Sequence, residues 1–385
     1  MKRNLLSTPG PTQIPEDVCA ALGRPIIHHR TPQFQENLKE GIAGMQYVLQ
    51  TKNDVYLLAS SGTGGMEAAV VNLLSPHDKA ITVEGGKFGE RWTELCTVYG
   101  IEAKVVEVPW GHAVQPRQIK QALEADKGIK AVFVTHCETS TGVTTDIKAI
   151  ADVIRKTDAV LVVDAISSVG VIDLKMDAWG VDVVVAASHK GLMLPPGLAM
   201  VAVNDKALRL IEQSKSPRFY FDLRASKKAA AKNDTPFTPA IGIIVALGES
   251  LKYIRAQGGL EAMFERCERL AKGTRAAAVA LGLELYPDKT CLSNVVTAVK
   301  LPANIDGGKL VKIMRDTHGI SIAGGQGELK GKIIRIAHMG CLKEEDIITG
   351  FTYLEVVLKE LGYSFPAGAG VNAAKKTFGE LSVAR

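Results

Sequence analysis

The sequence lacks long apolar runs, clustered cysteines and concentrated charge. No uninterrupted apolar stretch reaches the roughly 18 residues of a membrane-spanning helix, and Met1–Leu6 lacks the apolar segment of a signal peptide. The six cysteines show no CxxC spacing, which argues against a zinc site or a disulfide scaffold and suits a reducing cytoplasm. A net charge of +5, spread along 385 residues, offers no patch for nucleic acid. We therefore expect a cytoplasmic protein without metal, nucleic-acid or membrane partners.

Short apolar runs alternate with helical patterns between residues 50 and 205. The runs are rich in Val, Ile and Ala and apolar on both faces, which is typical of strands covered by helices on both sides. The alternation predicts an α/β fold with a mostly parallel, seven-stranded sheet between helices. The expected strands are Val55–Ser60, Ala80–Glu84, Lys104–Val108, Ala131–His136, Ala159–Asp164, Val181–Ala187 and Leu198–Val203. The expected helices between them are Gly65–Leu74, Gln115–Ala125 and Asp146–Lys156.

A smaller C-terminal α+β domain is expected after a long helical region that begins at Gly242. Its expected strands are Leu292–Lys300 and Lys332–Ala337. Its expected helices lie near Gly307–Asp316 and Lys343–Leu361. We expect an N-terminal arm over 1–18, a large domain over 19–257 and a small domain over 258–365. The stretch 366–385 is rich in Ala, Gly and Lys, and we expect it to be a loosely ordered tail.

Two charged residues lie at the carboxyl ends of predicted buried strands, where such sheets bind ligands. Asp164 ends one strand, and Lys190 lies just past another. A lysine amine can form a Schiff base with pyridoxal 5′-phosphate (PLP), and an aspartate can keep the pyridine nitrogen protonated. The pair therefore predicts a PLP enzyme. Taken singly, an exposed loop lysine and a helix-capping aspartate are the plainer interpretations.

A glycine-rich turn, Ser60–Gly65, follows the first predicted strand and opens a helix. Free backbone N–H groups at a helix N-terminus favour an anion, and the Ser61 and Thr63 hydroxyls can add donors. The turn matches neither a Walker loop nor GxGxxG. Alone it fits a glycine-rich helix start equally well, but beside Lys190 and Asp164 it predicts a phosphate site.

Three further side chains can complete such a site. Phe88, between glycines, can stack on a flat cofactor, or it can pack with Trp92 at a helix start. Thr139 can hydrogen-bond the cofactor's phenolic oxygen, or it can belong to an ordinary polar turn. Arg335, alone among apolar neighbours in Ile333–Ala337, can hold a substrate carboxylate or form an internal salt bridge.

Together these motifs resemble the class V aminotransferases, within the fold-type I PLP enzymes. The resemblance is strongest to the serine/alanine–glyoxylate (serine–pyruvate) aminotransferase group. It extends from Thr8-Pro9-Gly10-Pro11-Thr12 to about Leu361. It rests on the Ser-Gly-Thr turn, Thr-Ser-Thr-Gly, Val-Asp-Ala, Ser-His-Lys-Gly and Arg-Ile-Ala at compatible spacings.

The resemblance implies a role for each matching residue. Lys190 matches the internal-aldimine lysine, Asp164 the partner of the pyridine nitrogen, and Arg335 the carboxylate-binding arginine. Gly10 falls beside the substrate. The other matches concern the cofactor. Phe88 falls where the family has its stacking aromatic, often Trp, and Thr139 matches the hydroxyl near the phenolic oxygen. Ser61, Gly62 and Thr63 match the phosphate turn, and His189 replaces the glutamine usual before the lysine and can still reach the phosphate. Thr235, where some members have tyrosine, and Thr238 resemble the segment that reaches the neighbouring subunit's phosphate, which implies a homodimer with shared sites.

The implied reaction is PLP-dependent transamination of a small amino acid, alanine or serine, with a 2-oxo acid, glyoxylate or pyruvate. Two alternatives stay open. Cysteine desulfurases often show a His-Lys pair like 189–190, but they need a reactive cysteine on a mobile loop, whereas Cys341 lies in an apparent turn. Specificity for aspartate or 2-aminoethylphosphonate would need a second cation at the pocket mouth, for which His28, His29 and Arg30 are candidates.

Overall fold

A seven-stranded sheet forms the centre of the computed structural model, which describes residues 4–383. Its strands, in spatial order, are β2 (Asp54–Leu58), β10 (Ala199–Val203), β9 (Val183–Ala187), β8 (Val160–Asp164), β5 (Ile129–Thr135), β3 (Lys79–Glu84) and β4 (Glu102–Glu107). Only β10 runs against its neighbours. Every expected strand is present, and the predicted fold class is confirmed. The expectation of two apolar faces is wrong for β4, which is largely exposed because an edge strand needs no cover on both sides.

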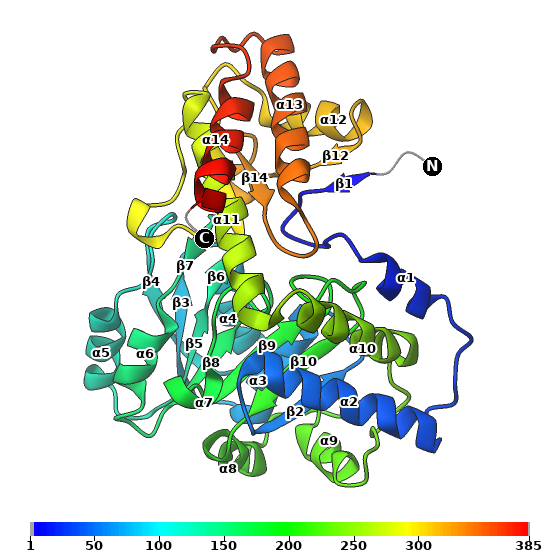
Figure 1. Ribbon diagram of the computed structural model, residues 1–385. Helices are drawn as coiled ribbons and strands as arrows, with labels where there is room; N and C mark the ends of the chain where they lie inside the picture. Colours follow the sequence, from blue (N-terminus) through cyan, green and yellow to red (C-terminus); the bar gives the residue numbers. More distant parts are fainter. Residues whose placement is uncertain (1–3, 384–385) are drawn as a thin grey trace.

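Helices cover both faces of this sheet and bury it in two apolar clusters (Figure 1). One face carries α2 (Pro32–Leu49), α5 (Pro116–Ala125), α6 (Ile147–Ile154) and α10 (Ile241–Ala256). The other carries α3 (Gly62–Leu73), α4 (Lys87–Val98), α8 (Asp205–Gln213) and α9 (Leu223–Ala230). The short elements are α1 (Glu16–Leu22), α7 (Met176–Trp179) and the hairpin of β6 (Cys137–Glu138) and β7 (Val143–Thr144). Because helices cover both faces, side chains at the ends of the strands are the ones that can face a ligand.

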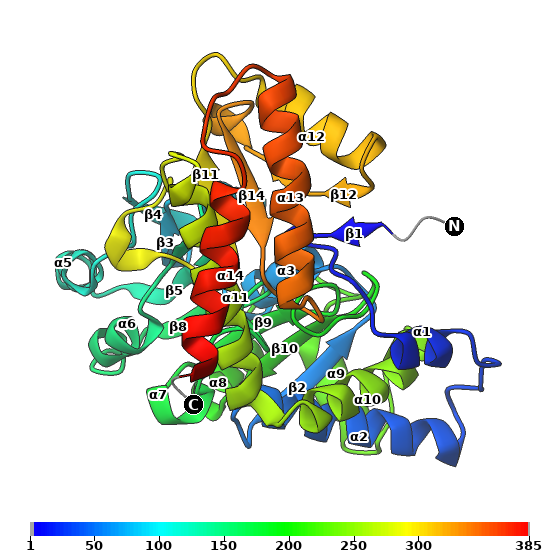
Figure 2. The ribbon, with the colours of Figure 1, turned by 45° about the horizontal axis from the view of Figure 1, so that its top comes forward.

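The small domain rises above the carboxyl-end side of the sheet and is joined to it by the long helix α11 (Gly259–Ala280) (Figures 1 and 2). It holds a three-stranded sheet of β11 (Val296–Lys300), β14 (Ile333–Ala337) and β13 (Ala323–Gly324). The N-terminal strand β1 (Leu5–Leu6) pairs with β12 (Ile320–Ser321). The other elements are α12 (Gly307–Asp316), α13 (Glu344–Glu360) and the 3-10 turns Lys289–Cys291 and Gly327–Leu329.

The expectation of a loosely ordered C-terminal tail is wrong for the residues that the structure describes. Residues Ala369–Val383 form helix α14, which lies along α11 (Figure 2). Ala374 and Phe378, one helical turn apart, are both buried against that helix. The tail's Ala, Gly and Lys content hid this helix, which docks through these two buried residues together with the partly buried Ala369 and Val371.

No helix within the described part of the chain is both long enough and apolar enough to cross a membrane.

Candidate active site

The carboxyl ends of β5, β8 and β9 bring the predicted site residues to one edge of the sheet. Asp164 is the last residue of β8 and pairs in register with Thr135 of β5. The backbone N–H of His136 then donates to the Asp164 carbonyl at 2.9 Å. Lys190 follows β9, and Thr139 follows the short strand β6. The shared edge therefore gathers Asp164, Thr139 and Lys190 as the strand-end argument predicted.

Lys190 is buried in a tight turn beneath the N-terminal arm. Its Nζ donates to the Pro9 carbonyl at 2.5 Å, and its own carbonyl accepts the Thr12 hydroxyl at 2.8 Å. A Cβ on Gly10 would meet the Lys190 side chain, and the backbone φ of Gly10 is +128°, so only glycine fits there. Burial lowers the pKa of Lys190 to about 8, against the opposing pull of Asp164. The amine is thus largely desolvated and easily made neutral.

Asp164 is buried and has only one partner for its carboxylate among the described residues. The backbone N–H of Ile166 donates to Oδ1 at 2.9 Å, and no described protein group donates to Oδ2. Burial raises the pKa of Asp164 to about 7. A cationic N–H at Oδ2 would satisfy this oxygen and bring the pKa down again. The site therefore fits the protonated ring nitrogen of PLP.

The Ser61–Thr63 turn presents polar groups at the start of α3. Ser61 and Thr63 are exposed, while Gly62 is buried against Ile166, the residue that caps Asp164. A Cβ on Gly62 would lie 2.6 Å from Ile166 Cδ1, so glycine lets the turn approach the end of β8. Arg91 of α4 also donates to the Thr63 hydroxyl at 3.4 Å. The turn thus combines a helix N-terminus, two hydroxyls and a cation, which together suit a phosphate.

The two aromatic candidates on α4 have different surroundings. Trp92 is fully buried in the core, with its ring centroid 4.8 Å from that of Phe133. Phe88 is half-buried, and the Arg91 guanidinium lies 5.1 Å from its ring centroid. The alternative interpretation, a Phe88–Trp92 packing pair, is not what holds Phe88. Stacking of Phe88 on a cofactor stays a prediction.

Arg335, on the central strand β14 of the small domain, is buried and forms no salt bridge within the described residues. Its Nε donates to the Gly324 carbonyl and its Nη1 to the Thr139 carbonyl, both at 2.8 Å. The internal salt bridge that the sequence left open is therefore absent there. Burial lowers the pKa of Arg335 to about 10, against the opposing pull of the Glu138 charge. A desolvated cation whose direct hydrogen bonds go to neutral carbonyls favours an anionic ligand.

His189 and the threonines at 235 and 238 are not brought to Lys190 in the same way. His189 is half-buried, its Nδ1 has no hydrogen-bond partner, and burial lowers its pKa to about 4. The Thr235 hydroxyl donates to the Phe237 carbonyl at 2.8 Å, and Thr238 is exposed. Both threonines line a small hollow beside β2. Their expected role toward a neighbouring subunit stays a prediction.

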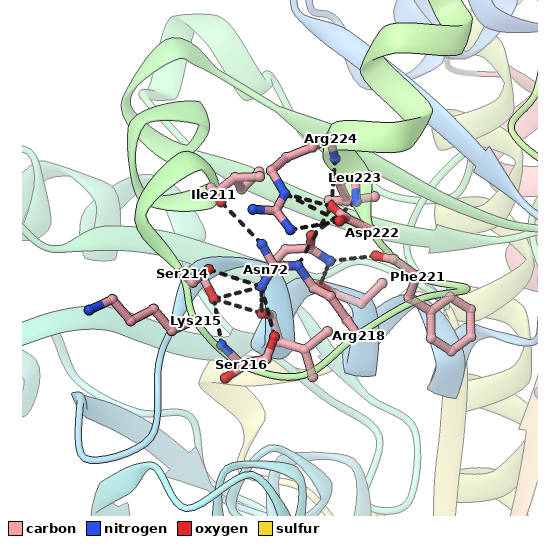
Figure 3. Close-up of polar contacts among 12 residues, drawn as sticks. Asn72, Ile211, Ser214, Lys215, Ser216, Arg218, Phe221, Asp222, Leu223 and Arg224 are labelled. Atoms are coloured by element: carbon pink, nitrogen blue, oxygen red, sulfur yellow. Dashed lines mark hydrogen bonds and ion pairs between the residues drawn. The ribbon is translucent and has the colours of Figure 1, made fainter.

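The segment before these threonines is clamped to α3 by two buried polar side chains (Figure 3). Arg218 donates from Nη1 to the carbonyls of Val71, Ser214 and Ser216 at 3.2, 3.2 and 2.9 Å. Asn72 of α3 donates to the Phe221 carbonyl at 2.6 Å and accepts from the Leu223 backbone N–H at 3.0 Å. The clamp holds Phe219 on the surface with 79% of its area exposed.

Sequence inspection missed two polar residues, Glu138 and Arg91. Glu138 lies beside Thr139 and accepts hydrogen bonds from the start of α4. Arg91 lies three residues after Phe88, a spacing that places both on one helix face. The helical spacing could have revealed Arg91. Nothing in the sequence around Glu138 announces its partners.

The rival desulfurase chemistry depends on a mobile reactive cysteine. Cys341 lies half-buried in the turn before α13, with its thiol directed to the Gln13 carbonyl at 3.5 Å. No group of three or more His, Cys, Asp or Glu side chains in residues 4–383 is arranged to hold a metal ion.

Comparisons with known proteins place this geometry in context. The family model "Aminotransferase class-V" matches residues 5–335. The chain is 43% identical to the small subunit of a soluble hydrogenase from Synechococcus sp. (strain PCC 6716), over 97% of each chain. It is 39% identical to the L-aspartate–glyoxylate aminotransferase of Paracoccus denitrificans (strain Pd 1222), over 99% of this chain and 98% of the relative. The crystal structure of ureidoglycine–glyoxylate aminotransferase from Bacillus subtilis superposes with a TM-score of 0.93 at 29% identity, covering 98% of this chain and 99% of that one.

Proposed function

Because the chain belongs to the class V aminotransferases and is a PLP-dependent transaminase, we propose that Lys190, Asp164 and Arg335 carry its reaction. The reaction transfers the amino group of a small amino acid, alanine or serine, to glyoxylate or pyruvate. One observation supports these assignments above the others. The carboxyl edge of the central sheet carries a desolvated lysine and an under-bonded buried aspartate, and Arg335 of β14 reaches the Thr139 carbonyl at this edge without an ion pair among the described residues.

The residues around Lys190 would hold the cofactor at its distinct parts. When bound, PLP supplies an electrophilic carbon and an electron-accepting ring. Asp164 would hold the ring nitrogen and Phe88 would lie against the ring. The turn at Ser61, Gly62 and Thr63 would take the phosphate, with Arg91 adding a positive charge. Thr139 would donate its hydroxyl to the phenolic oxygen.

Arg335 and Lys190 would act on the substrate. Arg335 binds the α-carboxylate through the N–H groups of its guanidinium that are not bonded to the Thr139 and Gly324 carbonyls. This contact fixes the orientation of the substrate's Cα–H bond. Lys190, with a pKa of about 8, is partly neutral near pH 7 and can accept the Cα proton. The ammonium so formed can return that proton to the cofactor side. Gly10 leaves room for Lys190 to move because it carries no side chain.

A homodimer with shared active sites is also part of this proposal. The surface around the Arg218 clamp exposes Phe219, and the turn after α1 exposes Ile26 with 78% of its area accessible. Large exposed apolar side chains favour an interface. Thr238, which is exposed, would donate to a phosphate on another copy. Light scattering should give twice the mass of the 41.2 kDa chain.

Aspartate is the second candidate donor, because the Paracoccus denitrificans relative that uses it by name is 39% identical over nearly the whole chain. The structure gives the expected second cation a partner, since Arg30 pairs with Asp234. His28 is exposed and His29 half-buried, each in the same turn as Arg30.

A donor panel tests the function directly. The loaded enzyme is given glyoxylate with alanine, serine, aspartate, cysteine or 2-aminoethylphosphonate in turn, and glycine formation is measured. We expect alanine or serine to give the highest kcat/KM. Aspartate as the best donor would establish the second candidate. Sulfide release from cysteine without glycine formation would contradict the proposal.

A further inference from the structure

Glu138 is a buried carboxylate that accepts four hydrogen bonds from two separate parts of the chain. The backbone N–H groups of Phe88 and Gly89 both donate to Oε2 at 3.0 Å. The backbone N–H and the hydroxyl of Ser140 donate to Oε1 at 3.1 and 2.5 Å. Glu138 keeps only 5% of its surface exposed. This one side chain therefore ties the first turn of α4 to the turn after β6.

Burial raises the pKa of the Glu138 carboxyl, and the arrangement of hydrogen-bond donors around it opposes that rise and favours the ionised form. Both oxygens face backbone N–H groups, which can only donate. The Ser140 hydroxyl accepts from the Lys87 backbone N–H at 3.1 Å, which leaves its proton to point at Oε1. Three of the four contacts come from backbone N–H groups, which cannot accept a carboxyl proton. The carboxylate is thus an anion at the N-terminus of α4, where the helix dipole also stabilises negative charge.

The two parts that Glu138 joins carry different members of the active site. On one side, Phe88 itself supplies one of the four N–H groups. On the other, Thr139 lies between Glu138 and Ser140, and its carbonyl accepts Nη1 of Arg335 at 2.8 Å. Phe88 and Arg335 are therefore linked by a short chain of contacts, through the Glu138 carboxylate and the tripeptide Glu138–Ser140.

Gly86 shows how closely the two parts fit. An added Cβ at this position would lie 2.5 Å from both Glu138 and Ser140 side-chain atoms. The residue before Lys87 must be glycine for the carboxylate to reach the helix start. The absence of a side chain at Gly86 is what allows this contact.

We propose that Glu138 is a positioning residue of the transaminase, fixing the Phe88 ring and the Arg335 guanidinium relative to each other. The inference rests on the proposed function, because it concerns the cofactor-facing and the substrate-facing member of that site. Glu138 touches neither ligand and acts through both residues. Its loss should weaken the binding of cofactor and of amino donor together.

The test compares Glu138→Gln with Glu355→Gln. Glu355 is a matched control: it is 7% exposed and accepts backbone N–H groups of Gly368 and Val371 at the start of α14, in the small domain. In each variant the new amide NH₂ faces at least one buried N–H that loses its acceptor. The measurements are the unfolding free energy, the Kd of PLP for the apo-protein by fluorescence quenching, and KM and kcat for the amino donor.

We expect both variants to lose similar stability, but only Glu138→Gln to raise the PLP Kd and the donor KM, each about tenfold, since a misplacement of about 1 Å at a site is costly. Glu355→Gln should leave both constants within about twofold of wild type. Equal constants in the two variants would overturn the inference while leaving the function intact. A wild-type protein that neither binds PLP nor transaminates would overturn the function and this inference with it.

A milder pair covers the case in which Glu138→Gln does not fold. Ser140→Ala removes one of the four donors and leaves the backbone contacts of Glu138 in place. Thr157→Val removes a hydroxyl that donates to the Ile154 carbonyl at 2.8 Å and accepts the Ala159 N–H at 3.3 Å, just before β8 and so at the amino edge of the sheet. Ser140→Ala should raise the donor KM about threefold and Thr157→Val should not. The same KM in both variants would contradict the role of Glu138.

Discussion

The two edges of the central sheet handle buried charge in opposite ways. At the amino edge, Asp182 precedes β9 and accepts the Leu161 backbone N–H at 2.7 Å and the Asn204 amide at 2.8 Å, with the Lys206 amine 3.9 Å away. At the carboxyl edge, Asp164 has one N–H donor among the described residues and a pKa raised to about 7. One aspartate is saturated by the protein, and the other keeps a place for a ligand.

Open volume alone does not mark the active edge. A cavity of about 720 Å³ lies near the amino end of β2, where α7 meets the start of α11. Its polar groups already bond to one another: Gln50 donates to Asp173, and Thr51 donates to Asp177, both at 2.5 Å. What distinguishes the active edge is unsatisfied charge rather than open volume.

Lysines at the two edges should give the largest contrast. Lys190→Ala should lower kcat by at least about 10⁴-fold, because it removes both the covalent anchor and the proton carrier. Lys206→Ala, which removes an amine bonded to the Thr157 and Ala159 carbonyls at the amino edge, should leave kcat within about twofold. Steady-state rates of both purified variants decide this. A Lys190→Ala enzyme with a kcat near that of wild type would show that the reaction does not depend on the lysine at the carboxyl edge.

The two aspartates offer the next largest effect. Asp164→Asn should lower kcat by roughly 10²–10³-fold, because an amide cannot stabilise a cationic ring nitrogen. Asp182→Asn should instead cost about 1–3 kcal/mol of unfolding free energy with little change in kcat, because it leaves a buried donor unpaired. Urea unfolding and steady-state kinetics on both variants measure the split. A large loss of kcat in Asp182→Asn, with kcat little changed in Asp164→Asn, would mean that the amino edge of the sheet is the active one.

Arg335 sharpens the contrast on the substrate side. Arg335→Lys should raise the donor KM by about 10–100-fold, since lysine cannot keep both carbonyl contacts and bind a carboxylate bidentately. The control Arg275→Lys changes another arginine that burial has stripped of solvent and that bonds the Ser293 carbonyl at 3.0 Å. Its KM should stay within about twofold of wild type. Equal KM values in the two variants would assign the carboxylate to another group.

The pH dependence of cofactor capture should show the smallest change. Only the neutral amine of Lys190 can attack the cofactor, so the capture rate of the apo-protein should fall about tenfold per pH unit below its pKa of about 8. The rate should level off above it. Protonation of Asp164 below about pH 7 acts in the same direction. Stopped-flow absorbance from pH 6 to 9.5 (a range of about 3.5 units) measures this, and a rate that keeps rising to pH 9.5 without levelling off would show that Lys190 is not desolvated.

The sequence located the charged residues because strand ends are local features. Val-rich runs marked β8 and β9, and Asp164 and Lys190 follow them directly, so the parallel-sheet rule placed both at one edge. The docking of α14 was missed because it depends on a few apolar residues packing against a distant helix. The exposure of β4 was missed because an apolar run does not reveal which strand lies at the edge.

Contacts between distant turns were beyond sequence reasoning. Glu138 and the Phe88 N–H are 50 residues apart, and only the fold brings them together. The same holds for Arg335, whose lack of a salt bridge is a property of its tertiary surroundings. Its strand and its arginine were predictable, but its neutral partners were not.

Chemical labelling tests the central claim most directly. Borohydride reduction of the PLP-loaded protein, followed by proteolysis and mass spectrometry, should find one pyridoxyl group per chain, attached to Nζ of Lys190. The same label on another lysine, or none on protein saturated with the cofactor, would contradict the account.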